Sequence, residues 1–233
     1  MAGPFTPTPR TRVKRLHERG HYDRETVHAI LDAGVICHVG YVIDGQPYVT
    51  PTSYWRHGDR LYWHGSSASR MLRHLKGEVP VCVEVTHFDG FVLARSGFHH
   101  SINYRSVMAF GRAQLVPEDD KLAALEHFVE RLFPGRWPEL RPPTAQEVKA
   151  TTVLRMALDE VSAKVRTGPP KDDEEDYALP VWAGVLPVTT GIGAPQPDPR
   201  LDPGTPLPVY LQDAPLPDLV VGRRDLELEP RAR

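Results

Sequence analysis

Apolar and polar residues alternate along much of the first two thirds of the chain, as they do in strands that bury one face. Residues 79–87 show this most clearly, with valines at alternate positions and Cys82, Glu84 and Thr86 between them. Further strands are expected over residues 35–43, 46–56, 60–64, 91–94 and 102–116. Tight turns are predicted at Asp44-Gly45, His57-Gly58-Asp59 and Asp89-Gly90. The pattern therefore predicts an antiparallel meander rather than β-α-β units.

Helical periodicity interrupts this series twice in the first half of the chain. Asp23 is placed to cap a short helix that ends at Gly34, and a second short helix lies within residues 65–76, before Gly77. The apolar positions expected to face the core are Val27, Ile30 and Leu31 in the first helix and Met71, Leu72 and Leu75 in the second.

Further helical signals follow the last of these strands. Residues 118–132 predict an amphipathic helix, and residues 144–150 predict a short one. The buried stripe of the longer helix is expected to be Leu122, Leu125, Phe128, Val129 and Leu132. Residues 151–166 fit a helix or a strand, and their β-branched content favours a strand. The elements together predict a mainly β fold with peripheral helices (α+β), whose sheet closes or nearly closes and protects its edges.

The composition fits one packed core without a broad charged surface. Of the 233 residues, 40% are hydrophobic and 25% are charged, and the formal net charge is -2. Nucleic acid is therefore not expected as a partner, and no apolar run approaches the roughly 18 residues that cross a bilayer. Cys37 and Cys82 lie in strand-like runs and form no CxxC pair, so we expect buried, reduced thiols in a cytoplasmic protein.

Three regions differ in composition. Residues 1–20 are polar and irregular and are expected to be an N-terminal extension, while residues 21–186 hold the strands and helices of one domain. Residues 187–233 are rich in proline, glycine and aspartate, which predicts an extended C-terminal arm without its own core. The arm either wraps over the barrel or a second subunit, or it is disordered.

The segment with the most chemical information is LYWHGSSASRMLRHLKG, residues 61–77. A predicted strand ends at His64, a serine-rich loop follows, and Arg70 falls in the first turn of the next helix. Unpaired N–H groups at a helix start, serine hydroxyls and a guanidinium together suit a phosphate monoester. The alternative is an ordinary serine-capped helix with a surface arginine.

Two further strands contain candidate ligand contacts. In QPYVTPTSYW, residues 46–55, Pro51 removes one ladder N–H, which predicts an edge or bulge whose backbone groups face a flat heteroaromatic ring. The alternative there is a plain twisted edge strand. In SINYRSVMAFGR, residues 101–112, alternation places Arg105 on one face with small residues, where it contacts a ligand or a subunit, or else faces solvent.

These three motifs, in this order and spacing, resemble the flavin-nucleotide-binding split barrels related to pyridoxamine 5'-phosphate oxidase. The branch that includes the nitroimidazole-resistance proteins is the most similar, and the tail segment VWAGVLPV is typical of it. The resemblance implies an antiparallel split β-barrel that binds FMN at the interface of a homodimer. It also favours strands over residues 151–166.

The resemblance assigns residues to the flavin. Residues 48–53 would line the isoalloxazine, and Ser69 and Arg70 fall where the oxidases have a basic pair for the phosphate, with Ser69 replacing one basic residue. His64 matches a histidine beside the substrate region, or alternatively bonds to the loop. The predicted cofactor contacts are Tyr48, Val49, Thr50, Pro51, Thr52, Ser53, Trp63, His64, Gly65, Ser67, Ser69, Arg70, Met71, Tyr104, Arg105 and Ser106.

We therefore expect an FMN-dependent oxidoreductase that acts on a small organic molecule, with NAD(P)H as a candidate reductant and His64 as the candidate substrate contact. No catalytic side chain is assigned, and the oxidases' pyridoxal-phosphate-binding residues do not carry over. The alternative is a flavin- or haem-binding protein without turnover, for which His64, His87, His99 and His100 offer haem ligands. No metal site is expected, because HExxH is absent and adjacent histidines on a strand point to opposite faces.

Overall fold

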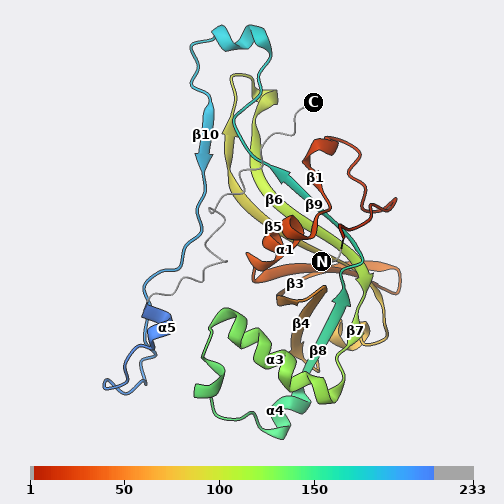
Figure 1. Ribbon diagram of the computed structural model, residues 1–233, viewed down its shortest axis with the longest axis vertical. Coiled ribbons are helices and arrows are strands. Elements are labelled where there is room, and N and C mark those ends of the chain that lie inside the picture. Colours follow the sequence, from red (N-terminus) through yellow and green to blue (C-terminus); the bar gives the residue numbers. More distant parts are fainter. Residues whose placement is uncertain (1–2, 213–233) are drawn as a thin grey trace.

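The computed structural model describes residues 3–212. Residues 213–233, the last part of the predicted arm, lie outside the described residues, as do residues 1–2. Within the described range, ten strands form one antiparallel sheet with helices around it (Figure 1).

The strands are β1 (Gly20–His21), β2 (Ile36–Ile43), β3 (Gln46–His57), β4 (Arg60–Ser66), β5 (Pro80–Leu93), β6 (Ser101–Arg112), β7 (Gln114–Leu115), β8 (Thr151–Ala157), β9 (Glu160–Arg166) and β10 (Gly184–Pro187). The helices are α1 (Arg24–Asp32), α2 (Arg70–Leu75), α3 (Glu118–Leu132), α4 (Ala145–Ala150) and α5 (Val209–Gln212). Short 3₁₀ turns are η1 (His17–Arg19), η2 (Gly97–His99), η3 (Trp137–Glu139) and η4 (Glu174–Ala178).

The sheet curls into a barrel at two places. Its strand order is β1-β9-β6-β5-β2-β3-β4-β8-β7, and β3 pairs first with β2 and then, from Tyr54 onward, with β4. On the far side β6 passes close to β8, because a Cβ on Gly111 would lie 2.6 Å from Met156 Cγ. The result is a half-open antiparallel barrel, which confirms the predicted split β-barrel with peripheral helices.

The alternating valines face the barrel interior as predicted. Val81, Val83 and Val85 are buried in the main core, whereas the side chains between them are not. Phe5, from the N-terminal segment, packs into the same core with 4% of its surface exposed. Burial raises the pKa of the Cys37 thiol to about 12. Cys82 is only half-buried.

The helices begin where their capping residues predict. Asp23 Oδ1 accepts a hydrogen bond from the Thr26 N–H (2.7 Å) at the start of α1, and Thr144 forms a capping box with Glu147 at α4. The stripe expected on α3 is less buried than its spacing predicts. Leu122 is 42% exposed, because α3 covers only a small cluster made of Trp55, Tyr62, Val116 and Val153.

Asp89-Gly90 is not a turn, and that prediction was wrong. β5 continues through it to Leu93, with a bulge between Phe88 and Gly90, so the predicted return strand 91–94 is the second half of β5. The chain turns instead around η2. Asp89 is held across the bulge by Arg105 of β6, and β10 pairs with the end of β5, so both neighbours keep the strand extended.

Two other predicted strands are each divided. Residues 102–116 break at the buried Ala113, where the chain leaves β6 and pairs through β7 with β8. Residues 151–166 form β8 and β9 around Leu158-Asp159, so the preference for a strand over a helix is confirmed. Because of the break at Ala113, the residues before it pair in β6 and the residues after it pair with β8 through β7.

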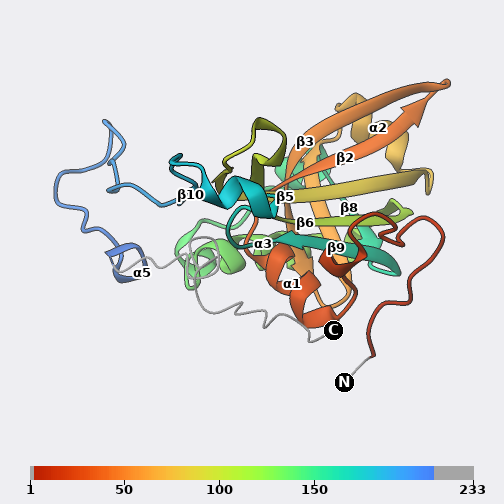
Figure 2. The same ribbon diagram turned by 90° about the horizontal axis from the view of Figure 1, so that it is seen from above.

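Beyond η4 the chain forms an arm. β10 pairs with the outer end of β5, and residues 186–207 are all exposed. At its far end the Tyr210 hydroxyl accepts a hydrogen bond from Arg136 Nη1 (3.0 Å) and donates one to Glu139 Oε2 (2.5 Å). Figure 2 shows the arm on the opposite side of the molecule from the hairpin of β2 and β3. Among the described helices, none has the length and apolar content to span a bilayer.

Candidate cofactor-binding site

The predicted phosphate loop and the predicted flavin strand lie against each other. Arg70, the first residue of α2, places its guanidinium carbon 4.5 Å from the centre of the Tyr48 ring on β3. Farther along α2, His74 Nε2 donates to Val42 O (2.9 Å) and fixes the helix to the hairpin of β2 and β3. Two motifs that are separate in sequence therefore meet in one cation–π contact.

Some backbone N–H donors at the start of α2 bond to no described residue. The Ser69 N–H donates to Ser66 O (2.9 Å), and the first bond within the helix runs from the Arg73 N–H to Ser69 O (2.9 Å). The N–H groups of Arg70, Met71 and Leu72 precede that bond. Ser69 is the N-cap residue of α2, but its side chain makes no capping bond, and Arg70 is exposed. The amides of this first turn, the Ser69 hydroxyl and the Arg70 guanidinium are the candidate donors to a phosphate.

The other predicted contacts on β4 and its loop support this site from behind. Trp63 is fully buried in the core and Met71 nearly so, so neither offers a surface to a ligand. Gly65 packs on α2, since a Cβ there would lie 3.0 Å from Leu72 Cδ1. The Ser67 N–H donates to the last carbonyl of α4 (2.7 Å). These contacts hold the loop in place.

Strand β3 divides its predicted contacts between two faces. Tyr48 stacks on Tyr41 with ring centroids 5.6 Å apart, and Thr50 Oγ1 shares a hydrogen bond with the Tyr41 hydroxyl (3.0 Å). Val49, 68% exposed, and Pro51 are on the opposite, outer face. Pro51 lies where β3 pairs with β2 alone, which confirms the predicted edge position. The remaining contacts on this strand, Thr52 and Ser53, are half-buried.

The third predicted segment lies apart from the other two, because β5 and β2 separate β6 from β3. Arg105 donates through Nε and Nη2 to the two carboxylate oxygens of Asp89 (2.9 and 2.8 Å). The alternative of a solvent-facing arginine is therefore wrong. Tyr104 and Ser106 are half-buried on the other face of the strand. The structure does not bring this segment to Arg70.

His64 is a half-buried imidazole without a hydrogen-bond partner among the described residues. Its ring centre lies 5.8 Å from that of Trp55 and 5.0 Å from that of Phe128 on α3. Nδ1 is buried and bonds to nothing described, so the alternative of a histidine bonded to the loop is wrong. Burial lowers the pKa of His64, which favours the neutral ring. A neutral imidazole is the form that ligates a metal.

In the other three histidines considered as haem ligands, at least one ring nitrogen lies near a described polar group. His87 Nε2 donates to Ile30 O (2.9 Å), and His100 Nδ1 donates to Ser96 O (2.9 Å). His99 Nδ1 lies 3.8 Å from Asp172 Oδ1. His64 is the candidate in which neither ring nitrogen contacts a described polar group, whereas His87 and His100 each keep one ring nitrogen for a ligand.

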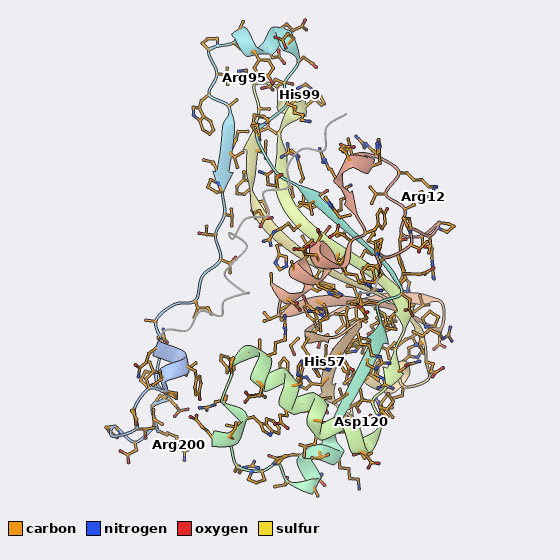
Figure 3. All side chains as sticks on the ribbon, viewed as in Figure 1. Arg12, His57, Arg95, His99, Asp120 and Arg200 are labelled. Carbon is orange, nitrogen blue, oxygen red and sulfur yellow. The ribbon has the colours of Figure 1, made fainter. Side chains whose placement is uncertain are left out.

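A group that the sequence did not predict lies at the far end of the β5–β6 hairpin, where Figure 3 shows Arg95 and His99 near each other. His99, Asp172 and Asp176 place one possible metal-ligand atom each within 4.8 Å. However, Asp172 already accepts bonds from the Arg95 N–H (2.9 Å) and Nη1 (3.0 Å). The guanidinium charge opposes a second cation there, so we interpret the group as an ion-pair cluster.

The comparisons with known proteins place this geometry in a family. Residues 23–165 match the family model described as pyridoxamine 5'-phosphate oxidase. The chain belongs to this family. No curated protein sequence matches it.

Two solved structures are similar over most of the chain. The flavocytochrome Anf3 from Azotobacter vinelandii is 50% identical, with a TM-score of 0.85, and the match covers 90% of this chain and 98% of that one. The FAD and haem binding protein from Mycobacterium smegmatis is 40% identical, with a TM-score of 0.81, and covers 83% and 96% respectively.

Proposed function

We propose that this protein binds a flavin and a haem and transfers electrons between them. Its relatives at 50% and 40% identity are described as a flavocytochrome and as an FAD and haem binding protein. They favour the haem-binding alternative over an FMN-dependent oxidoreductase of small organic molecules, and they favour FAD over FMN. Both groups carry electrons, while the protein supplies binding, orientation and electrostatics.

The unpartnered ring of His64 is the observation on which the haem proposal rests. Histidine is a common axial ligand of haem iron, and it ligates in the neutral form that burial favours here. Trp55 and Phe128 surround the ring with the apolar, aromatic environment that suits a porphyrin. His64 would thus hold the iron, in place of the substrate contact expected from the sequence.

The flavin proposal rests on the contact between Arg70 and Tyr48. Arg70, the Ser69 hydroxyl and the first amides of α2 would hold a phosphate of the flavin nucleotide. The ring system would lie along the edge of β3 near Pro51, on the strand that carries Tyr48, beside the backbone groups of Thr50 and Thr52. Both features come from motifs that the sequence predicted.

The absorbance spectrum of the purified protein tests this proposal before any cofactor is added. We expect the visible bands of an oxidised flavin together with a Soret band. His64→Ala should remove or shift the Soret band and leave the flavin bands, because only the iron ligand is lost.

His17→Ala is the matched control, since His17 is exposed and is not one of the haem-ligand candidates. An unchanged Soret band in His64→Ala would transfer the ligand role to another residue. A protein that takes up neither flavin nor haem would refute the function.

We also propose a homodimer through the outer face of the sheet. Ile36, Val42, Val49 and Met108 are large apolar side chains that share this face and are each more than two fifths exposed. Exposed apolar side chains gathered on one face mark an interface. Sedimentation of the flavin-loaded protein should give about twice the chain mass of 26.1 kDa, and a mass near 26.1 kDa would contradict the dimer.

A further inference from the structure

Arg166, the last residue of β9, is a buried arginine without an acidic partner. Only 8% of its surface is exposed. Its Nη1 donates to Asn103 Oδ1, but its Nε is buried and bonds to no described group. Among the described residues, no carboxylate forms an ion pair with it. A buried guanidinium without a counter-charge is costly to fold around.

Two other arginines of the same chain show what the free edge of Arg166 is suited to hold. Arg105 donates through Nε and Nη2 to Asp89 (2.9 and 2.8 Å). Arg56 uses the same two atoms for Asp32, with 2.9 Å between Nε and Oδ1. This edge of the guanidinium matches the spacing of two oxygens of a carboxylate or phosphate. In Arg166 neither Nε nor Nη2 bonds to a described residue.

The surroundings of Arg166 are also positive rather than neutral. Burial lowers its pKa, and the nearby charge of Arg19 on η1 lowers that pKa further. Asn103 cannot supply a negative charge, and its amide is held in place because Nδ2 donates to Gly168 O (3.2 Å). An anion placed beside Arg166 would relieve both the burial cost and the repulsion between the two arginines.

We propose that Arg166, with Arg19 beside it, binds an oxyanion through the Nε–Nη2 edge, either a carboxylate or a phosphate group of a ligand. Tyr104, a predicted flavin contact, is paired with Arg166 across β6 and β9. The oxyanion is therefore either a charged group of a bound cofactor or a small free anion that reaches this edge of the sheet. The site rests on the geometry of Arg166, and it stands whether or not the protein proves to be a flavocytochrome.

The first experiment uses the full chain, freed of cofactors, and compares its melting temperature in phosphate, diphosphate and acetate with that in chloride at equal ionic strength. At saturating anion, binding to the folded state alone should raise the melting temperature by about 5 °C. Arg166→Met should lose this rise. Arg60→Met, which removes an exposed arginine without an ion pair, should keep it.

Arg166→Lys distinguishes anion binding from a structural role, since it keeps the charge but not the two-pronged edge. It should reduce the anion response without abolishing it. A wild-type melting temperature that is the same in all these anions as in chloride would overturn the proposal, whatever the variants do. So would an equal rise in wild type and Arg166→Met.

Cofactor titrations then identify the source of the oxyanion. If Arg166→Met weakens FAD binding about tenfold or more and leaves haem binding unchanged, the group is the diphosphate of the flavin, and Arg166 takes the phosphate role proposed for Arg70. The reverse result assigns it to a haem propionate. If both affinities stay unchanged while the anion response is lost, the ligand is a free oxyanion. Each of these three outcomes supports the oxyanion site at Arg166. If the site does not exist, the melting temperatures in the different anions already show it.

Discussion

Arg70 and Arg73 lie one turn apart on α2, but only Arg70 reaches β3, where it covers the ring of Tyr48. This contact holds the guanidinium beside the free amides of the helix start. We expect Arg70→Ala to weaken flavin binding by about 1.5–3 kcal/mol, because a charge-assisted bond to the phosphate is lost. Flavin fluorescence during titration of the cofactor-free protein measures the change.

Arg73→Ala is the control for this measurement, since it removes the same charge from the same helix without touching Tyr48. Its flavin affinity should stay within a few tenths of a kcal/mol of wild type, as for other exposed charges. Equal losses in the two variants would show that Arg70 acts only through net charge, and unchanged affinity in Arg70→Ala would refute its contact with the phosphate.

Sequence reasoning found Arg70 and His64 as candidates because both follow a local strand–loop–helix pattern. It could not find that His64 lacks a hydrogen-bond partner, since Trp55 and Phe128 come to it from β3 and α3. Arg166 was missed for a similar reason. Its sequence context is an ordinary strand end, and what distinguishes it is the absence of a described acid near it in space.

At the scale of elements, the dipeptide Asp-Gly forms two different local structures in this chain. Asp44-Gly45 makes the predicted hairpin, with both φ angles in the left-handed region at 50° and 79°. Asp89-Gly90 continues a strand, because Arg105 holds the aspartate and β10 pairs beyond the glycine. These neighbours lie 16 and about 95 residues away along the chain. Local patterns therefore predicted the strands but not which of them continue.

Gly90 also determines where the arm attaches. Its φ is 158°, and a Cβ there would lie 2.7 Å from Leu186 O of β10. We expect Gly90→Ala to push β10 away from β5 and to open residues 184–187, which are paired in the wild type, to proteases. Limited proteolysis followed by mass spectrometry locates the cuts, which should appear earlier in this region than in wild type.

Gly97→Ala is the matched control, because a Cβ at Gly97 meets nothing within 4 Å and its backbone angle is ordinary. Its cleavage pattern should equal that of wild type. If Gly90→Ala is cut no faster than Gly97→Ala, the pairing of β10 with β5 does not depend on the close approach at Gly90.

For the whole molecule, the histidines link stability to pH. Burial is the main cause that lowers the pKa values of His28, His64, His87 and His127 below 6.5. Between those lowered values and 6.5, the unfolded chain binds more protons than the folded one. The free energy of unfolding must therefore fall as the pH drops below 6.5. The carboxylates with a lowered pKa, such as Glu147 at about 2, change the free energy of unfolding only at more acidic pH.

His127 is the histidine at which this coupling can be isolated. Its Nε2 lies 3.0 Å from His57 Nδ1 and joins α3 to β3, the region in which Figure 3 labels His57. After burial, the proximity of His57 is the largest cause that lowers the pKa of His127. Protonation therefore opposes the docking of the helix that covers His64. We expect the urea midpoint to fall between pH 6.5 and about one unit below it, and His127→Gln to reduce that fall.

His100→Gln should leave the slope unchanged, since this exposed histidine bonds only to a nearby carbonyl. A urea midpoint that does not vary over this range would mean that the buried rings charge as readily as free ones. If the slope is present but His127→Gln leaves it intact, the other three histidines account for it, and α3 stays docked as the pH falls. If His127→Gln does reduce the slope, acidification loosens the packing of α3. Access to His64 then depends on how firmly the fold holds this helix and not on His64 alone.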